Sequence, residues 1–153
     1  MYTKNESSRI KQAFWTTFGK YLSPVPSAEG LKINWINYKT GVKDVKFFLD
    51  ADSQTASVGI KLLHKDIEIQ QIHFEEFMKL SFNLEEYIGE PWDWHLHSYD
   101  NEGKIISKIF KELKPSNIYN SEDWPSIIAF LKPRIIALDN FWSDWKYGFE
   151  ELQ

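Results

Sequence analysis

Residues 121–149 read SEDWPSIIAFLKPRIIALDNFWSDWKYGF, and they contain the strongest periodic pattern of the chain. Large apolar residues recur there at alternating steps of four and three, which is the spacing of one stripe along an α-helix. The stripe consists of Trp124, Ile128, Leu131, Ile135, Leu138, Trp142 and Trp145. The spacing therefore predicts a long C-terminal helix whose apolar face covers the core of a small domain.

Two prolines lie within this helix and have different consequences. Pro125 falls in the first turn, where the N–H that proline lacks has no intrahelical partner anyway. Pro133 falls in the interior, where it removes a hydrogen bond to the carbonyl of Ala129 and should bend the helix. We therefore expect a kinked helix of two segments. A second apolar row widens its buried face and argues against a coiled coil; the row consists of Ile127, Phe130, Ala137 and Phe141.

The composition is that of a single domain without disulfides. The chain has 153 residues, of which 16% are aromatic, and that is enough to fill one hydrophobic core. It has no cysteine, which excludes thiol chemistry and fits a reducing compartment. It also lacks an apolar run of about 18 residues, the length that spans a membrane. We therefore predict a soluble, cytoplasmic protein with one domain over residues 1–153 and no membrane contact.

Turn signals and periodicity predict the remaining elements. We expect a helix over 6–22, strands over 31–38, 43–51 and 56–64, a helical segment from Asp66 to Gly89, and strands over 92–99 and 104–111. The second helical segment can be interrupted near Ser81–Asn83, because these residues are weak helix formers. The order α-β-β-β-α-β-β-α predicts an α+β fold, a five-stranded, mainly antiparallel sheet covered by three helices.

The strand over 92–99 carries the clearest candidate for a metal site. Alternate residues of a strand point to the same face, so Asp93, His95 and His97 would present one carboxylate and two imidazoles together. Zinc and similar divalent ions take these ligand types. The same alternation also describes the polar outer face of a hairpin, and two histidines at this spacing are common by chance. We therefore favour the polar face over the metal site.

The predicted order of a helix, three strands, a helix and a strand is also that of the core of restriction-endonuclease-like nucleases. Those enzymes hold Mg²⁺ with an acid on the second strand and with Asp/Glu-x-Lys on the third. Asp50 or Asp52 stands at the first position and Lys61 at the last, but Gly59 occupies the position of the second acid. The two-carboxylate site cannot form, so an active nuclease is disfavoured and a decayed nuclease fold stays an alternative.

No other sequence motif indicates catalysis. The chain lacks a Gly-x-Ser-x-Gly elbow, a Walker loop and a dinucleotide fingerprint, so we predict no catalytic residue and no cofactor. The net charge is −4, and only two of the basic residues are arginines. Both facts argue against general nucleic-acid binding. A local basic patch that binds nucleic acid is still compatible with this sequence. The residues that would form it are Lys46, Lys61 and Lys108. The meeting of these three and Lys43 on one sheet face would favour a nucleic-acid-associated module.

Aromatic residues also crowd the end of the chain. Trp142, Trp145, Tyr147 and Phe149 supply more large apolar surface than the last turns of a helix usually bury. A partner protein or a second copy of the chain would cover it. Our leading interpretation is therefore a non-catalytic binding or accessory domain that acts through protein association, as a homodimer or with a protein partner.

The C-terminal half also follows a recognisable order of residues. A glycine that ends a helix, Gly89, precedes Trp94; the strand residues Ser107-Lys108-Ile109 then precede Asp123-Trp124 at the start of the final helix. This pattern resembles a family of bacterial domains of unknown function. Its members occur alone or as the C-terminal part of proteins whose N-terminal half resembles a restriction-type nuclease. The resemblance implies a stand-alone accessory or binding domain and brings no catalytic residue to this chain.

Overall fold

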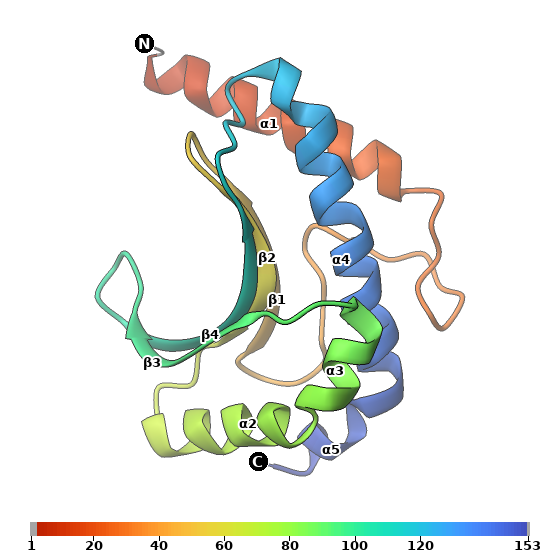
Figure 1. The fold of residues 1–153 in the computed structure, drawn as a ribbon, viewed down its shortest axis with the longest axis vertical. Coiled ribbons are helices and arrows are strands. Elements are labelled where there is room, and N and C mark those ends of the chain that lie inside the picture. The colour runs from red at the N-terminus through yellow and green to blue at the C-terminus, as the bar shows by residue number, and fades with distance from the viewer. Residues whose placement is uncertain (1–2, 153) are drawn as a thin grey trace.

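An antiparallel sheet forms one layer of the structure, and the helices cover one of its faces (Figure 1). The structure is a computed structural model, and it describes residues 3–152. The helices are α1 (Lys4–Leu22), α2 (Ile67–Lys79), α3 (Ser81–Ile88), α4 (Trp124–Trp145) and α5 (Tyr147–Glu150). The strands are β1 (Val45–Ala51), β2 (Ala56–Leu62), β3 (Asp93–Tyr99) and β4 (Ile105–Leu113). A 3₁₀ turn over Ser121–Asp123 precedes α4.

The predicted α+β class is confirmed, but the predicted numbers of strands and helices are wrong. Within residues 3–152 the sheet has four strands instead of five, in the order β1-β2-β4-β3, and there are five helices instead of three. Each neighbouring pair of strands is antiparallel, as expected. The prediction of a single domain over 1–153 stays a prediction, and residues 1, 2 and 153 lie outside the described part.

The missing strand is the one predicted over 31–38. The backbone turns at Asn34, whose side-chain oxygen accepts the backbone N–H groups of Ile36 and Asn37. Such a bond gives the backbone an alternative to a strand ladder and turns the chain. Trp35 is buried, and its indole N–H donates to the carbonyl of Val25. The segment is therefore a loop held by its own side chains.

The predicted second helical segment is two helices. Asp66 caps α2 as expected, because its side chain accepts the N–H groups of Glu68 and Ile69. The interruption lies at Leu80, one residue before the predicted Ser81–Asn83, where the backbone leaves the helical region and α3 begins. Gly89 ends α3 in the left-handed conformation, with a φ of 76°.

The final helix buries its predicted stripe, but it is not divided at Pro133. Helix α4 runs through that proline as one element, and a short separate helix, α5, completes the predicted range. Residues of both apolar rows are buried in the core. On α4 they are Ile127, Phe130, Leu131, Ile135, Leu138, Phe141 and Trp142. The ends of the stripe, Trp124, Ile128 and Trp145, are more exposed. Figure 1 shows α4 passing alongside the sheet from the α1 end to the α2 end.

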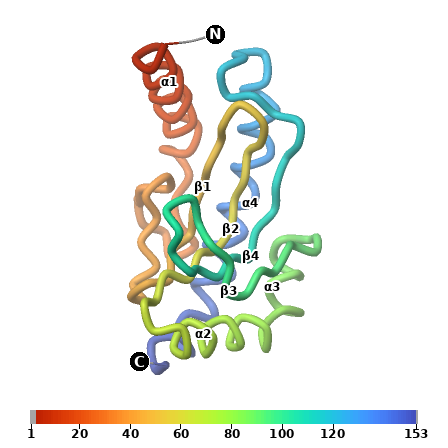
Figure 2. The backbone as a smooth tube through the Cα atoms, turned by 90° about the vertical axis from the view of Figure 1, so that its left-hand side faces the viewer, coloured from red at the N-terminus to blue at the C-terminus, as the bar shows by residue number. Residues whose placement is uncertain are grey.

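The helices cover one face of the sheet and leave the other open (Figure 1). The covered face presents alternate residues such as Phe47, Ile60 and Ile109, which are buried in the core. The sheet curves so that the open face is concave, and the hairpin of β3 and β4 projects on that side (Figure 1). Figure 2 looks onto the open face and shows the strands in front of α4. The face opposite the core is therefore a bare, curved sheet surface.

Gly59 in the middle of β2 leaves no room for a side chain. A Cβ atom at this position would lie 2.2 Å from the carbonyl oxygen of Ile109 and 2.7 Å from the Cα of Phe110. Both are backbone atoms of β4, which cannot yield without breaking the pairing of the two strands. Glycine is thus required at this position for the packing of the sheet.

We predict that Gly59→Ala lowers the free energy of unfolding by about 1–3 kcal/mol or more, because the added methyl group forces β2 and β4 apart. Gly19→Ala is the matched control: a Cβ there meets a single side-chain atom at 3.6 Å, inside the helix α1. That change should raise stability by about 0.5–1 kcal/mol. Urea unfolding measures both, and a neutral Gly59→Ala would contradict this description of the sheet.

Candidate functional site

Three lysines form a row across the open face of the sheet. Lys46 of β1 lies opposite Lys61 of β2, and Lys61 lies opposite Lys108 of β4. On the other side of Lys108 the register places His95 of β3. We call Lys46, Lys61 and Lys108 the basic row. The structure thus brings together these three candidates for nucleic acid, whereas Lys43 precedes β1 and lies outside the row.

Two phenylalanines lie next to the basic row, under the ends of its lysine side chains. Phe48 and Phe110 occupy the next cross-strand row, separated by Gly59, and each is only 6% exposed. The Lys61 ammonium lies 4.4 Å from the ring centre of Phe48, and the Lys108 ammonium lies 4.3 Å from that of Phe110. Such cation–π contacts hold the ammonium groups over the rings. The face therefore presents charge to a ligand and keeps its aromatic rings covered.

A third row carries the opposite charge. Asp50 and Glu112 lie on either side of Ser57, two residues along the strands from the aromatic row. Because a strand rises about 3.3 Å per residue, successive rows on one face are about 6.6 Å apart. The open face therefore has a basic end and an acidic end, with the covered rings between them.

The positive charges of the basic row lack close carboxylate partners. None of the ion pairs found in residues 3–152 includes Lys46, Lys61 or Lys108. Burial lowers the pKa of Lys61, and the neighbouring charge of Lys108 lowers it further; Asp50 opposes this shift, and Lys46 and Asp100 have lesser effects that lower and raise it. Like charges opposite each other destabilise a sheet. The row is therefore a local positive site on a chain whose net charge is negative.

A cavity of about 770 Å³ lies at the basic end of the open face. Lys46 and Lys61 line it from the sheet, and the loop 100–104 between β3 and β4 lines it from the opposite side. Its remaining charged lining is Lys65, Asp100, Glu102 and Lys104. Small-molecule sites commonly measure about 300–1,000 Å³, so this cavity can admit part of a large anionic ligand.

The three metal candidates do not converge. The pairing of β3 with β4 shifts between His95 and Ser98, and His97 at this irregularity has a φ of 51°. Its Nε2 atom lies 3.1 Å from the carbonyl oxygen of Ile67, whereas His95 contacts the ring of Phe110 edge-on. Within residues 3–152 no group of three His, Asp or Glu side chains could hold a metal ion. The irregularity breaks the alternation that suggested Asp93, His95 and His97 as one set.

The structure also removes the basis of the comparison with nucleases. Residues 31–38 are not a strand, so the order of elements that suggested a nuclease core is not present in residues 3–152. Position 59 cannot carry the missing acid, because even a Cβ atom would clash with β4. Asp52 is held in the β1–β2 turn, where it accepts the N–H groups of Gln54 and Thr55.

The aromatic residues at the end of the chain divide into two kinds. Trp142 and Phe149 are buried in the core of the chain itself, and Trp142 donates its indole N–H to the carbonyl of Thr40. They are therefore not available to a partner. Trp145 is 36% exposed and Tyr147 is 62% exposed, so these two alone of the four predicted binding residues offer a surface.

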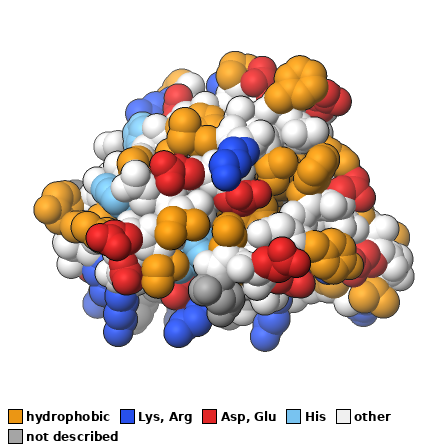
Figure 3. Space-filling model, turned by 90° about the horizontal axis from the view of Figure 1, so that it is seen from below, with side chains coloured by type: hydrophobic (Ala, Val, Ile, Leu, Met, Phe, Trp, Pro, Cys, Tyr) orange, Lys and Arg blue, Asp and Glu red, His pale blue; other side chains and the backbone are white. Residues whose placement is uncertain are grey.

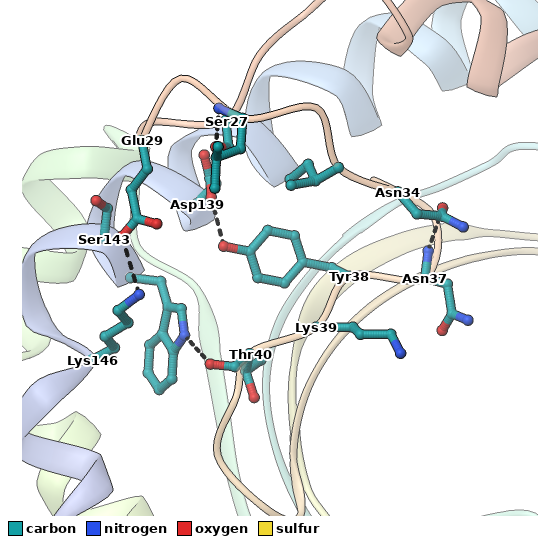
Figure 4. A pocket seen from close by; sticks show the side chains of 13 residues that line it. Ser27, Glu29, Asn34, Asn37, Tyr38, Lys39, Thr40, Asp139, Ser143 and Lys146 are labelled. Atoms are coloured by element: carbon teal, nitrogen blue, oxygen red, sulfur yellow. Dashed lines mark hydrogen bonds and ion pairs between the residues drawn. The ribbon is translucent and has the colours of Figure 1, made fainter.

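A second pocket, of about 310 Å³, lies between the loop 27–40 and the C-terminal half of α4 (Figure 4). Tyr38 and Asp139 face each other within it, and the Tyr38 hydroxyl donates to the carboxylate at 2.5 Å. Burial, followed by this hydrogen bond, raises the pKa of Tyr38, which therefore keeps its proton. No sequence motif indicates this pocket, because it depends on how a loop folds back onto a distant helix.

Family comparison agrees with the resemblance drawn from the sequence. The family described as a domain of unknown function (DUF4268) matches residues 10–146. The chain belongs to this family. No curated protein and no solved structure matches it. Membership of the DUF4268 family assigns no activity, and the expected bacterial origin and nuclease association stay predictions. None of the helices within residues 3–152 has both the length and the apolar character needed to cross a membrane.

Two buried histidines beside the basic cavity predict how stability depends on pH. The rings of His64 and His73 lie 4.2 Å apart, and neither nitrogen of His64 has a hydrogen-bond partner in the described part of the chain. Burial, followed by the proximity of His73, lowers the pKa of His64. In the unfolded chain His64 takes up a proton near pH 6.5, as histidine usually does. In the folded protein the same protonation requires a lower pH, so protonation favours the unfolded state.

We expect the free energy of unfolding to fall as the pH drops below about 6.5, and to level off once the pH is below the lowered pKa of folded His64. His64→Phe should reduce this slope, because the uncharged ring keeps the packing. His95→Asn, at an exposed position, serves as the control. Denaturant unfolding between about pH 8 and pH 5 measures the effect, and an unchanged slope in His64→Phe would contradict it.

Proposed function

We propose that this domain binds the phosphate backbone of a nucleic acid on the concave open face of its sheet. The proposal rests on the basic row, in which three lysines on adjacent strands face outward without an ion-paired carboxylate. Repulsion between directly opposed like charges weakens strand pairing by roughly 0.2–1 kcal/mol per pair. Phosphates bound along the row would relieve this repulsion. A bound phosphate backbone would therefore explain why three lysines lie side by side.

The geometry supports recognition of the backbone rather than of the bases. Neighbouring strands lie about 4.8 Å apart, so the basic row extends across about 10 Å and suits more than one phosphate. Phe48 and Phe110 lie beneath the lysine side chains, so base stacking on them would first require the lysines to move. We therefore propose binding that depends weakly on sequence and strongly on salt. Such a module acts without catalysis, in the cytoplasm, alone or beside a nuclease.

The test is the salt dependence of binding to a short fluorescent single-stranded oligonucleotide. We predict that the triple variant Lys46→Gln, Lys61→Gln, Lys108→Gln reduces the slope of log K against log salt by about 2, since each lost phosphate contact contributes about 0.7. The affinity should fall about 100-fold at 0.1 M salt. Fluorescence anisotropy at several salt concentrations measures both quantities. A duplex of the same sequence, tested in parallel, shows which form the curved face prefers.

Two comparisons make this test specific. Lys20→Gln removes an exposed lysine at the end of α1 and should leave binding unchanged. The triple variant should unfold at about the same denaturant concentration as the parent protein, because the loss of repulsion within the row offsets the loss of the cation–π contacts. The proposal is wrong if the parent protein does not bind at low salt, or if the triple variant binds as tightly as Lys20→Gln.

A second candidate function, association with another copy of this chain, is supported by exposed side chains on α2, on α3 and near the end of the chain. Exposed apolar side chains and acidic side chains are interleaved on the face seen from below (Figure 3). Phe82 is 72% exposed and Tyr147 is 62% exposed, and Met78 and Trp145 are also exposed. A homodimer would cover such side chains, and aromatic residues are enriched at interfaces of this kind.

Sedimentation velocity at micromolar concentration tests this candidate. We expect a dimer that Phe82→Glu and Tyr147→Glu together convert to a monomer, because charges would be buried without partners. A parent protein that sediments as a monomer at every concentration would remove the homodimer and leave binding by the basic row unaffected.

A further inference from the structure

Asp139 on α4 is a buried carboxylate whose hydrogen-bond donors are both neutral. The residue is 5% exposed. Its oxygens accept the Tyr38 hydroxyl at 2.5 Å and the backbone N–H of Ala28 at 2.7 Å. A carboxylate has about four acceptor sites, so these two bonds leave part of its capacity unused.

The lysines around this pocket do not neutralise Asp139. Lys146 pairs with Glu29 instead, with 3.1 Å between its ammonium nitrogen and a carboxylate oxygen. Figure 4 shows the Lys39 side chain directed away from Asp139. No ion pair within residues 3–152 includes Asp139. Burying a charge without an opposite charge is unfavourable, so Asp139 is a negative site that a cation would stabilise.

The pocket beside Asp139 indicates what kind of cation fits. Its volume of about 310 Å³ lies at the lower end of the range for small-molecule sites. Half-buried Tyr38 lines it together with the polar side chains of Asn34 and Ser143, whereas Trp142, which also lines it, is 2% exposed and packs in the core. Aromatic rings attract organic cations, and no group of three metal-ligating side chains exists in the described residues. The lining therefore favours an organic ammonium or guanidinium group over a metal ion.

We propose that this pocket binds a small organic cation, a ligand with a primary amine or guanidinium group that forms an ion pair with the Asp139 carboxylate. Tyr38 positions the carboxylate through its hydroxyl, and Asn34 and Ser143 offer hydrogen bonds to the rest of the ligand. This site is separate from the basic row, so binding of a cation here is independent of nucleic-acid binding there.

Agmatine and spermidine are the probes, and the uncharged 1,4-butanediol is the control. We expect millimolar agmatine or spermidine to raise the melting temperature of the intact protein by several degrees, and butanediol to leave it unchanged. Asp139→Asn keeps the side-chain volume but removes the charge. Isothermal titration should show agmatine binding to Asp139→Asn about tenfold or more weaker than to the parent protein.

A second variant keeps the test decisive if Asp139→Asn fails to fold. Ser143 lies four residues after Asp139 on α4, so Ser143→Lys places a cation on the same helix face, where it can pair with the carboxylate. This variant should melt at a higher temperature without any probe and should no longer respond to agmatine. The inference is overturned if neither amine stabilises the parent protein, if butanediol acts equally, or if Ser143→Lys still responds to agmatine as the parent does.

Discussion

Trp142 of α4 joins the helical layer to the sheet and to the long loop between α1 and β1. Its ring meets that of Phe47 edge-on at 5.4 Å, and it lies 5.1 Å from Phe149 and 6.1 Å from Phe77. Its indole N–H donates to the carbonyl of Thr40 in the loop. Burying a large aromatic side chain stabilises a fold by about 1.5–3 kcal/mol. This cluster keeps the helices on one face of the sheet, and the other face is left open as a consequence.

An open sheet face lets positive charge gather in one place even though the net charge of the chain is negative. The net charge is −4, yet the antiparallel register places Lys46, Lys61 and Lys108 side by side and puts Asp50 and Glu112 two rows away. The interior holds an isolated negative charge, because the Asp139 carboxylate is buried beside a pocket. Both sites depend on α4, which holds the sheet from behind and contributes Asp139 itself.

The sequence predicts elements with strong local patterns and misses those that depend on distant contacts. The stripe of α4, the Asp66 cap and the end of α3 at Gly89 follow from periodicity and capping, which are local. The strand predicted over 31–38 is wrong because the Asn34 side chain turns the chain there. The three lysines are recognisable as candidates in the sequence, but their alignment needs the register of β2 with β4, which periodicity does not supply. The pocket at Asp139 joins residues about a hundred positions apart and was not predicted.

In our proposal, the open sheet face is the surface through which the domain contacts an anionic polymer. This surface can be mapped by titrating a short single-stranded oligonucleotide into ¹⁵N-labelled protein and following the backbone amide resonances. The resonances of Lys46, Lys61, Lys108 and the loop 100–104 should shift together and saturate, while those of α4 stay in place. Shifts confined to α4 and α5, or no shifts at low salt, would contradict the proposal.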